Sequence, residues 1–111
     1  MSDREIDPNK AVDFIRDNGK KFAQAKADRI YLEEYRKSLK AILMKRSGEN
    51  AVNAQEREAY AHPEYQELLK GLREAVEAEE TLRWQMVAAE ARVEVWRSQE
   101  ASNRVEYRAT L

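Results

Sequence analysis

The chain has 111 residues, of which 37% are charged, with only three glycines, two prolines and no cysteine. A composition dominated by Ala, Glu, Arg, Leu and Lys is typical of long helices or coiled coils and argues against a sheet protein. Disulfides and thiol chemistry are excluded, and the lack of a long apolar run or a signal peptide predicts a soluble intracellular protein.

The first predicted helix covers residues 8–46. Asp7 can cap it, and Pro8 suits the first helical position. Apolar residues then recur every three or four positions, which is the helical period. Lys45 and Arg46 suit the negative end of the helix dipole, and Gly48 supplies a stop.

A short helix is expected at about residues 53–61, where Asn53 can cap and Glu56 stands at the capping-box position. His62 precedes a proline and is therefore disfavoured in the helical region. Pro63 then opens a third helix, which we predict to extend to about residue 103. The tail beyond it is predicted to be frayed.

Two long helices joined by a short element predict an all-α fold. Its architecture is expected to be a long antiparallel hairpin in which the helices pack as in a coiled coil. Pairing Leu43 with Leu68 places Ile15 opposite Trp96 and aligns apolar positions along the whole length. Arg29 and Glu79 are the polar interruptions, and they either pair across the seam or extend separately to water. The predicted seam residues are Phe22, Leu32, Leu39, Leu72, Met86 and Trp96.

Charge is distributed unevenly: residues 1–46 carry 12 Lys/Arg and 8 Asp/Glu, whereas residues 47–111 carry 8 and 13. A basic half can indicate nucleic-acid binding. We favour the alternative that the basic and acidic halves pair with each other inside the hairpin. Tyr31 and Tyr35 stand near basic residues, a pattern that can bind single-stranded nucleic acid, and the candidate contact comprises Lys20, Lys21, Lys26 and Arg29. Acidic residues are interleaved with them, so we favour helix packing as the role of these tyrosines.

The two tryptophans belong to different faces of the third helix. Trp84 and Trp96 are separated by twelve positions, which places them about 120° apart around the helix axis. A two-helix hairpin cannot bury both faces of each helix, so we expect at least a dimer within an oligomeric helical bundle. The predicted contacts to another chain are Trp84, Val87, Ala88, Ala91 and Val95, with Ala27 and Tyr31 on the first helix.

Residues that carry chemistry are scarce. His62 is the single histidine, and without cysteine a zinc site is improbable. There is no glycine-rich phosphate loop or nucleophile elbow, and the glutamates at 74–80 lack the Glu-x-x-His pattern of di-iron bundles. We therefore predict a non-enzyme with no cofactor and no metal.

Three stretches carry a resemblance: "DRIYLEEYRKSLKAILM" (28–44), "AYAHPEY" (59–65) and "LRWQMVAAEARVEVWRSQEASNR" (82–104). Together they resemble small helical early-region proteins of tailed bacteriophages and prophages, found near recombination genes. The resemblance implies a phage-encoded accessory protein in the cytoplasm of the bacterial host, and it assigns no functional residues. In outline the hairpin also resembles phage Gam-type nuclease inhibitors and DNA-end binders.

Three functions follow as hypotheses. The first is an accessory protein of phage DNA metabolism or recombination that binds a recombination protein, a host nuclease or DNA. The second is an inhibitor of a host nuclease or defence complex. The third is a structural coiled-coil adaptor. In all three the chain also binds itself and does not enter a membrane.

Overall fold

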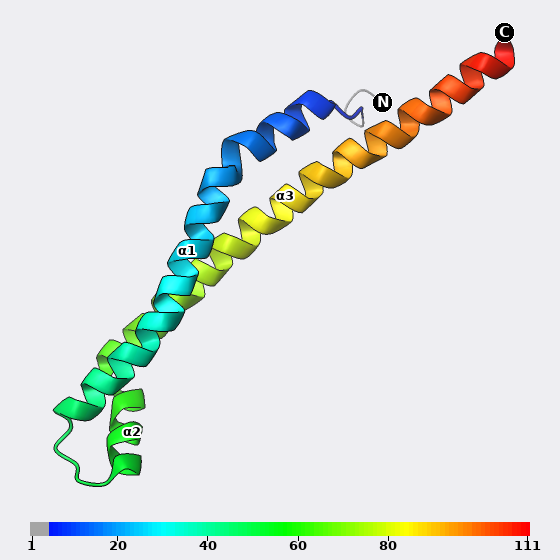
Figure 1. Cartoon of the computed structure of the whole chain (residues 1–111). Coiled ribbons are helices and arrows are strands. Elements are labelled where there is room, and N and C mark those ends of the chain that lie inside the picture. Colours follow the sequence, from blue (N-terminus) through cyan, green and yellow to red (C-terminus); the bar gives the residue numbers. More distant parts are fainter. Residues whose placement is uncertain (1–4) are drawn as a thin grey trace. The chain divides into compact units, whose positions relative to one another are not determined.

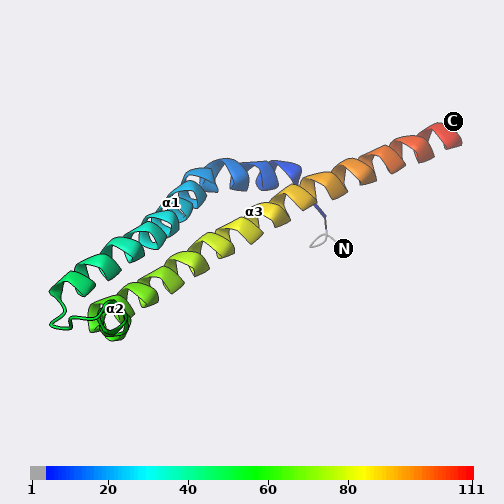
Figure 2. The ribbon, with the colours of Figure 1, turned by 60° about the horizontal axis from the view of Figure 1, so that its bottom comes forward.

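The computed structural model describes residues 5–111, and its three helices are α1 (Pro8–Arg46), α2 (Val52–Ala61) and α3 (Pro63–Thr110) (Figure 1). Helices hold 91% of these residues, and no strand occurs among them. The prediction of an all-α fold is confirmed. Within each of the two compact units described below, the segments of α1 and α3 run in opposite directions, as in a helical hairpin (Figures 1 and 2).

α1 begins and ends at the residues that the sequence predicted. The Asp7 carboxylate accepts hydrogen bonds from the backbone N–H groups of Asn9 (2.9 Å) and Lys10 (3.3 Å), as an N-cap does. Lys45 and Arg46 occupy the last turn, where the helix dipole favours positive charge.

α2 begins at Val52, and the capping box predicted for it is wrong. Ala51 holds the N-cap position and makes no side-chain cap. The Asn53 side chain accepts a hydrogen bond from the neighbouring Ala54 N–H (3.0 Å) instead. The Glu56 carboxylate forms an ion pair with Lys40 (2.5 Å) and makes no capping bond. A hydrogen bond between two charged groups is stronger than one to a neutral backbone N–H.

α3 begins after an extended residue, His62, whose Nδ1 accepts a hydrogen bond from the Glu64 N–H (3.1 Å). The helix continues to Thr110, so the predicted fraying beyond about residue 103 is wrong. The segment after Asn103 contains no glycine or proline, and Arg108 in the last turn suits the dipole. Local propensity therefore extends the helix beyond its apolar stripe.

The chain forms two compact units, and each long helix contributes to both. The unit formed by residues 23–80, here called the connector unit, contains α2 and the adjoining halves of α1 and α3 (Figure 2). The terminal unit contains residues 5–22 and 81–111 among those described. The prediction of a single domain stays a prediction. The core of the connector unit consists of Leu39, Leu43, Ala59, Tyr65 and Leu68.

Ion pairs join the basic and acidic parts of the chain within the connector unit. Arg29 binds Glu79, Lys40 binds Glu56, and Arg46 binds Glu64 at 3.3 Å. Each pair links α1 to α2 or to α3. The interpretation that the two oppositely charged halves pair is therefore confirmed for these residues, and so is the pairing of Arg29 with Glu79.

Two contacts, one in each unit, depart from the predicted register, whereas the predicted pair Leu43 and Leu68 lies in the same core cluster. In the connector unit a Cβ at Gly71 would lie 4.0 Å from Leu32 Cδ1. In the terminal unit Phe14 and Ala89 line the same hollow. Both pairs have position numbers that add up to 103, whereas the predicted pairing of Leu43 with Leu68 requires 111.

The predicted pairing of Phe22 with Ala89 is therefore wrong, because Ala89 shares its hollow with Phe14. The pairing of Ile15 with Trp96 stays a prediction. Phe22 lies eight residues from Phe14, which is about 12 Å along the helix. The difference is close to one heptad, and a slip of one heptad replaces one apolar pair with another. Leu39 is buried and five other predicted seam residues are half-buried: Phe22, Leu32, Leu72, Met86 and Trp96.

Candidate protein-interaction surfaces

α3 presents an exposed apolar surface in the terminal unit, which we call the Trp84 stripe: Trp84, Val87, Ala88, Ala91 and Val95. The exposed fractions of Trp84, Val87 and Val95 are 59%, 39% and 46%. The residues on the other face of this helix segment, from Leu82 to Trp96, are buried or half-buried. The two tryptophans thus lie on different faces of α3, and Trp84 is exposed to solvent.

The indole of Trp84 is held at the surface by its neighbour. The Arg83 guanidinium carbon lies 4.5 Å from the Trp84 ring centroid, within the range of a cation–π contact. An indole that is oriented in the free protein loses less side-chain freedom when a partner covers it. Ala88 and Ala91, both exposed, follow one and two turns later and leave room for a closely packed helix.

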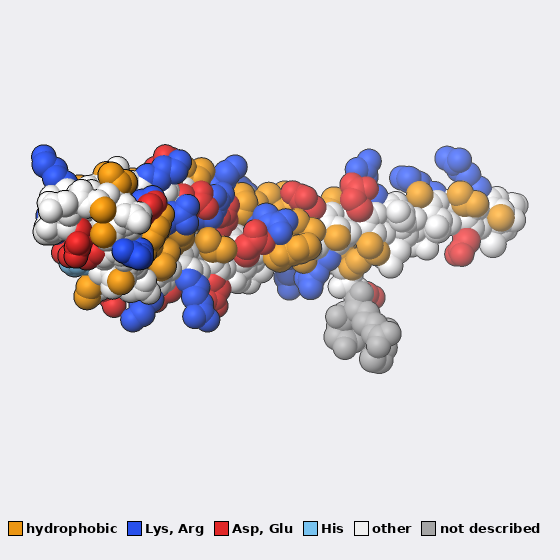
Figure 3. Space-filling model, turned by 90° about the horizontal axis from the view of Figure 1, so that it is seen from below, with side chains coloured by type: hydrophobic (Ala, Val, Ile, Leu, Met, Phe, Trp, Pro, Cys, Tyr) orange, Lys and Arg blue, Asp and Glu red, His pale blue; other side chains and the backbone are white. Residues whose placement is uncertain are grey.

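A second exposed apolar surface lies on α1 in the connector unit. It is formed by Ala27, Ile30, Tyr31 and Tyr35, and we call it the tyrosine face. The two tyrosine rings stack in parallel with centroids 6.1 Å apart, and Tyr31 is 66% exposed. Figure 3 shows that hydrophobic side chains reach the surface between acidic and basic ones.

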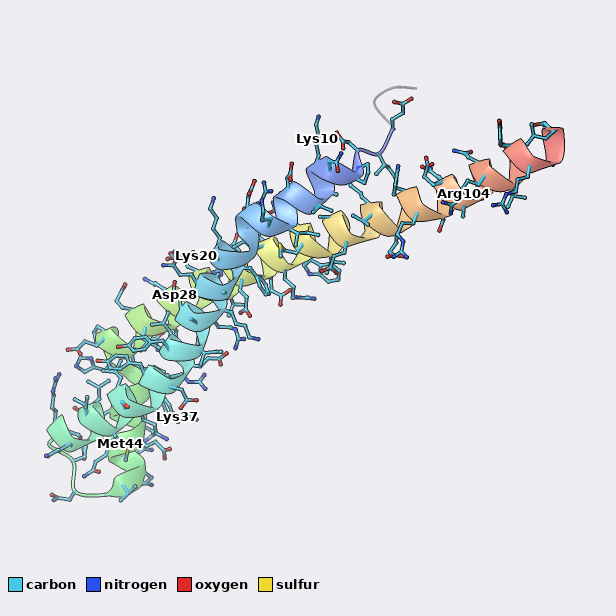
Figure 4. All side chains as sticks on the ribbon, turned by 45° about the horizontal axis from the view of Figure 1, so that its top comes forward. Lys10, Lys20, Asp28, Lys37, Met44 and Arg104 are labelled. Atoms are coloured by element: carbon cyan, nitrogen blue, oxygen red, sulfur yellow. The ribbon has the colours of Figure 1, made fainter. Side chains whose placement is uncertain are left out.

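The basic residues predicted to contact nucleic acid differ in their surroundings. Lys20, Lys21 and Lys26 are exposed, and Figure 4 shows Lys20 on the outer side of α1. Arg29 donates hydrogen bonds to the carboxylates of Glu79 and Glu33, and these bonds raise the pKa of Arg29 above its ordinary value. Its guanidinium is thus engaged inside the chain and is not presented to a phosphate.

A cluster that the sequence analysis did not single out joins α1 to α2. The Lys40 ammonium donates to Glu56 and lies 4.8 Å from the Tyr60 ring centroid, and the hydrogen bond to Glu56 raises the pKa of Lys40. Tyr60 packs edge-to-face on Tyr65 at 5.2 Å. The sequence signal that could have revealed this cluster is the pair of tyrosines on either side of His62–Pro63. These tyrosines hold α2 against α1 and do not form a separate binding site.

The hollows of the described chain offer little reactive chemistry. The hollow beside Phe14 has a volume of about 310 Å³, and its polar lining is Lys10, Gln85 and Arg92. Within residues 5–111 no group of histidine, aspartate and glutamate side chains is placed to hold a metal ion. No helix over these residues has the length and apolar character needed to cross a membrane.

Comparison with known proteins identifies no relative: no family model, no curated protein and no solved structure matches the chain.

Proposed function

We propose that this protein is a non-catalytic helical interaction protein that self-associates and binds a protein partner through exposed helix faces. The observation that carries the proposal is the Trp84 stripe. A large aromatic side chain, two valines and two alanines share one helix face and are all exposed. Exposed apolar side chains gathered on one helix face support a binding role for this surface.

The tyrosine face supports a separate contact for a partner. Tyrosine is enriched in protein interfaces because its ring is apolar and rigid while its hydroxyl remains hydrated. Tyr31 and Tyr35 already stack on each other in the chain. Their conformation therefore needs little further ordering when a partner covers them.

The test of self-association is the mass of the protein in solution. Sedimentation equilibrium at micromolar concentrations should give at least twice the chain mass of 13.0 kDa. Trp84→Ala should shift the protein toward the single chain. Tyr107→Ala is the matched control, because Tyr107 is an exposed aromatic residue of α3 outside the stripe. A single-chain mass for the unmodified protein at all concentrations would refute self-association.

We further propose that the partner belongs to phage DNA metabolism, with inhibition of a host nuclease or defence complex as the alternative. This proposal is supported by the resemblance of the sequence to early-region phage proteins. The exposed lysines Lys20, Lys21 and Lys26 favour a weak accompanying contact with nucleic acid. Lys20→Glu with Lys21→Glu should then abolish a salt-dependent gel shift, and an unchanged shift would contradict the lysine contact.

A further inference from the structure

We infer that the Trp84 stripe binds the same stripe of a second copy, with the two α3 helices antiparallel. In this arrangement Trp84 packs against the partner's Val95, and Ala88 packs against the partner's Ala91. The inference rests on the proposed self-association and adds the surface, the direction and the register of the contact.

The order of side-chain sizes along the stripe favours the antiparallel direction. At the central positions 84, 88, 91 and 95 the order is large, small, small and intermediate. Antiparallel pairing places small residues opposite each other at the centre and a tryptophan opposite a valine at each end. Two helices that cross at an angle are closest at one point and diverge on both sides of it. Alanines therefore suit the crossing point, and larger residues suit both ends.

Parallel pairing fits the same residues less well. It would place Trp84 against the partner's Trp84 at one end, next to a layer of two alanines. The helix spacing that two tryptophans require exceeds the spacing at which two alanines touch, because interhelical distance follows the size of the contacting side chains. The alanine layers would then be left with voids, which cost packing energy.

The residues that flank the stripe are compatible with antiparallel pairing. On one side, Gln85 lies opposite the partner's Arg92 and can accept a hydrogen bond from it. On the other side, Val87 lies opposite the partner's Glu94. No like charges are placed opposite each other at these positions. The contact is also isologous, so it closes as a two-fold dimer and does not propagate into a filament.

The absence of cysteine allows a direct test by disulfide cross-linking in the full chain. Ala88→Cys and Ala91→Cys are prepared separately with tags of different size, mixed, equilibrated and oxidised. Both alanines are exposed, so neither variant disturbs the core. The mixture should yield predominantly the mixed disulfide between Cys at 88 and Cys at 91. In the proposed register two cysteines at 88 are offset by about 4.5 Å along the axis, which disfavours a bridge between them.

Glu90→Cys is the matched control, because Glu90 is exposed at the centre of the same helix segment but lies outside the stripe. Its cross-linking measures random collision. Three results would overturn the inference. A dominant bridge between two copies of Ala88→Cys would indicate a parallel dimer, and cross-linking no faster than Glu90→Cys in a protein of oligomeric mass would place the contact elsewhere. A single-chain mass in the absence of oxidant would overturn both this inference and the proposed self-association.

Discussion

Arg29 is bound by two carboxylates, and one of them is buried. Glu79 is only 7% exposed and is the one buried charged side chain among residues 5–111. The Arg29 guanidinium donates hydrogen bonds to Glu79, which lies on α3, and to Glu33, which lies one turn further along α1. A buried carboxylate that loses its guanidinium partner keeps the cost of desolvation without the compensating attraction. Removing one member of the pair should therefore lower the stability of the protein more than removing both.

We predict that Arg29→Met lowers the melting temperature of the protein and that adding Glu79→Leu recovers most of the loss. In the single variant the buried Glu79 keeps its desolvation cost but loses the attraction of the Arg29 guanidinium, and replacing both charges by apolar residues of similar volume removes that cost. Circular dichroism melts of the two variants measure the effect. Arg97→Met is the control, because its ion pair with Glu94 is exposed and contributes little. A double variant that is as unstable as Arg29→Met alone would contradict this explanation.

At the scale of the helices, the start and end of α1 and the start of α3 were readable from local signals. Asp7, Pro8, Lys45 and Pro63 act through their own backbone and the nearest turn, so their effect does not depend on the rest of the fold. The exposed position of Trp84 was readable too, because helical period alone separates it from Trp96.

The register could not be predicted from the same pattern. A heptad pattern looks nearly the same after a slip of seven residues, so Leu32 finds an apolar partner in either register. What selects the register is the geometry of the connector, where Lys40 and Tyr60 tie α2 to α1. These contacts depend on how far α2 folds back, and a linear sequence pattern does not encode that distance.

Two cysteine pairs distinguish the observed register from the predicted one. We expect Leu32→Cys with Gly71→Cys to form an intramolecular disulfide, because a Cβ added at Gly71 would lie 4.0 Å from Leu32 Cδ1. Leu32→Cys with Glu79→Cys, the pair of the predicted register, should not. Mass spectrometry of the oxidised variants under denaturing conditions reports the difference. Preferential bridging of the second pair would mean that the observed register is wrong.

The last part of α3 lacks tertiary support. Every residue from 101 to 111 is exposed, although the helix continues to Thr110. We predict that Ser102→Pro removes helix signal locally but hardly changes the melting temperature. Ala78→Pro, also at an exposed α3 position, should be strongly destabilising, because proline costs about 3 kcal/mol in a helix interior. Similar melting temperatures for the two variants would contradict the prediction.

At the scale of the whole molecule, the two tryptophans should report different equilibria. Trp96 is half-buried within its own chain, whereas Trp84 lies on the proposed contact between chains. Trp96→Ala should lower the melting temperature equally at all protein concentrations. Trp84→Ala should weaken assembly. The melting temperature of this variant should therefore depend on protein concentration in a different way from that of the unmodified protein.

Melting curves over a hundredfold range of concentration separate these outcomes. If Trp84→Ala were destabilised by the same amount at every concentration and kept the oligomeric mass, Trp84 would be an ordinary packing residue. The assignment of the stripe to a contact between chains would then fail.

The continuity of α1 and α3 has a consequence for proteases. Proteases require a locally unfolded segment, and neither long helix contains a loop between the two units. The irregular segment at residues 47–51 is the longest break between helices, and Glu49 within it is exposed. Between residue 8 and residue 100, limited digestion with a glutamate-specific protease should therefore cut first in this segment, apart from any trimming at Glu106 in the unsupported end of α3. The two fragments should remain bound to each other until denaturant is added, because the ion pairs and the apolar core that join the helices do not depend on the cut loop.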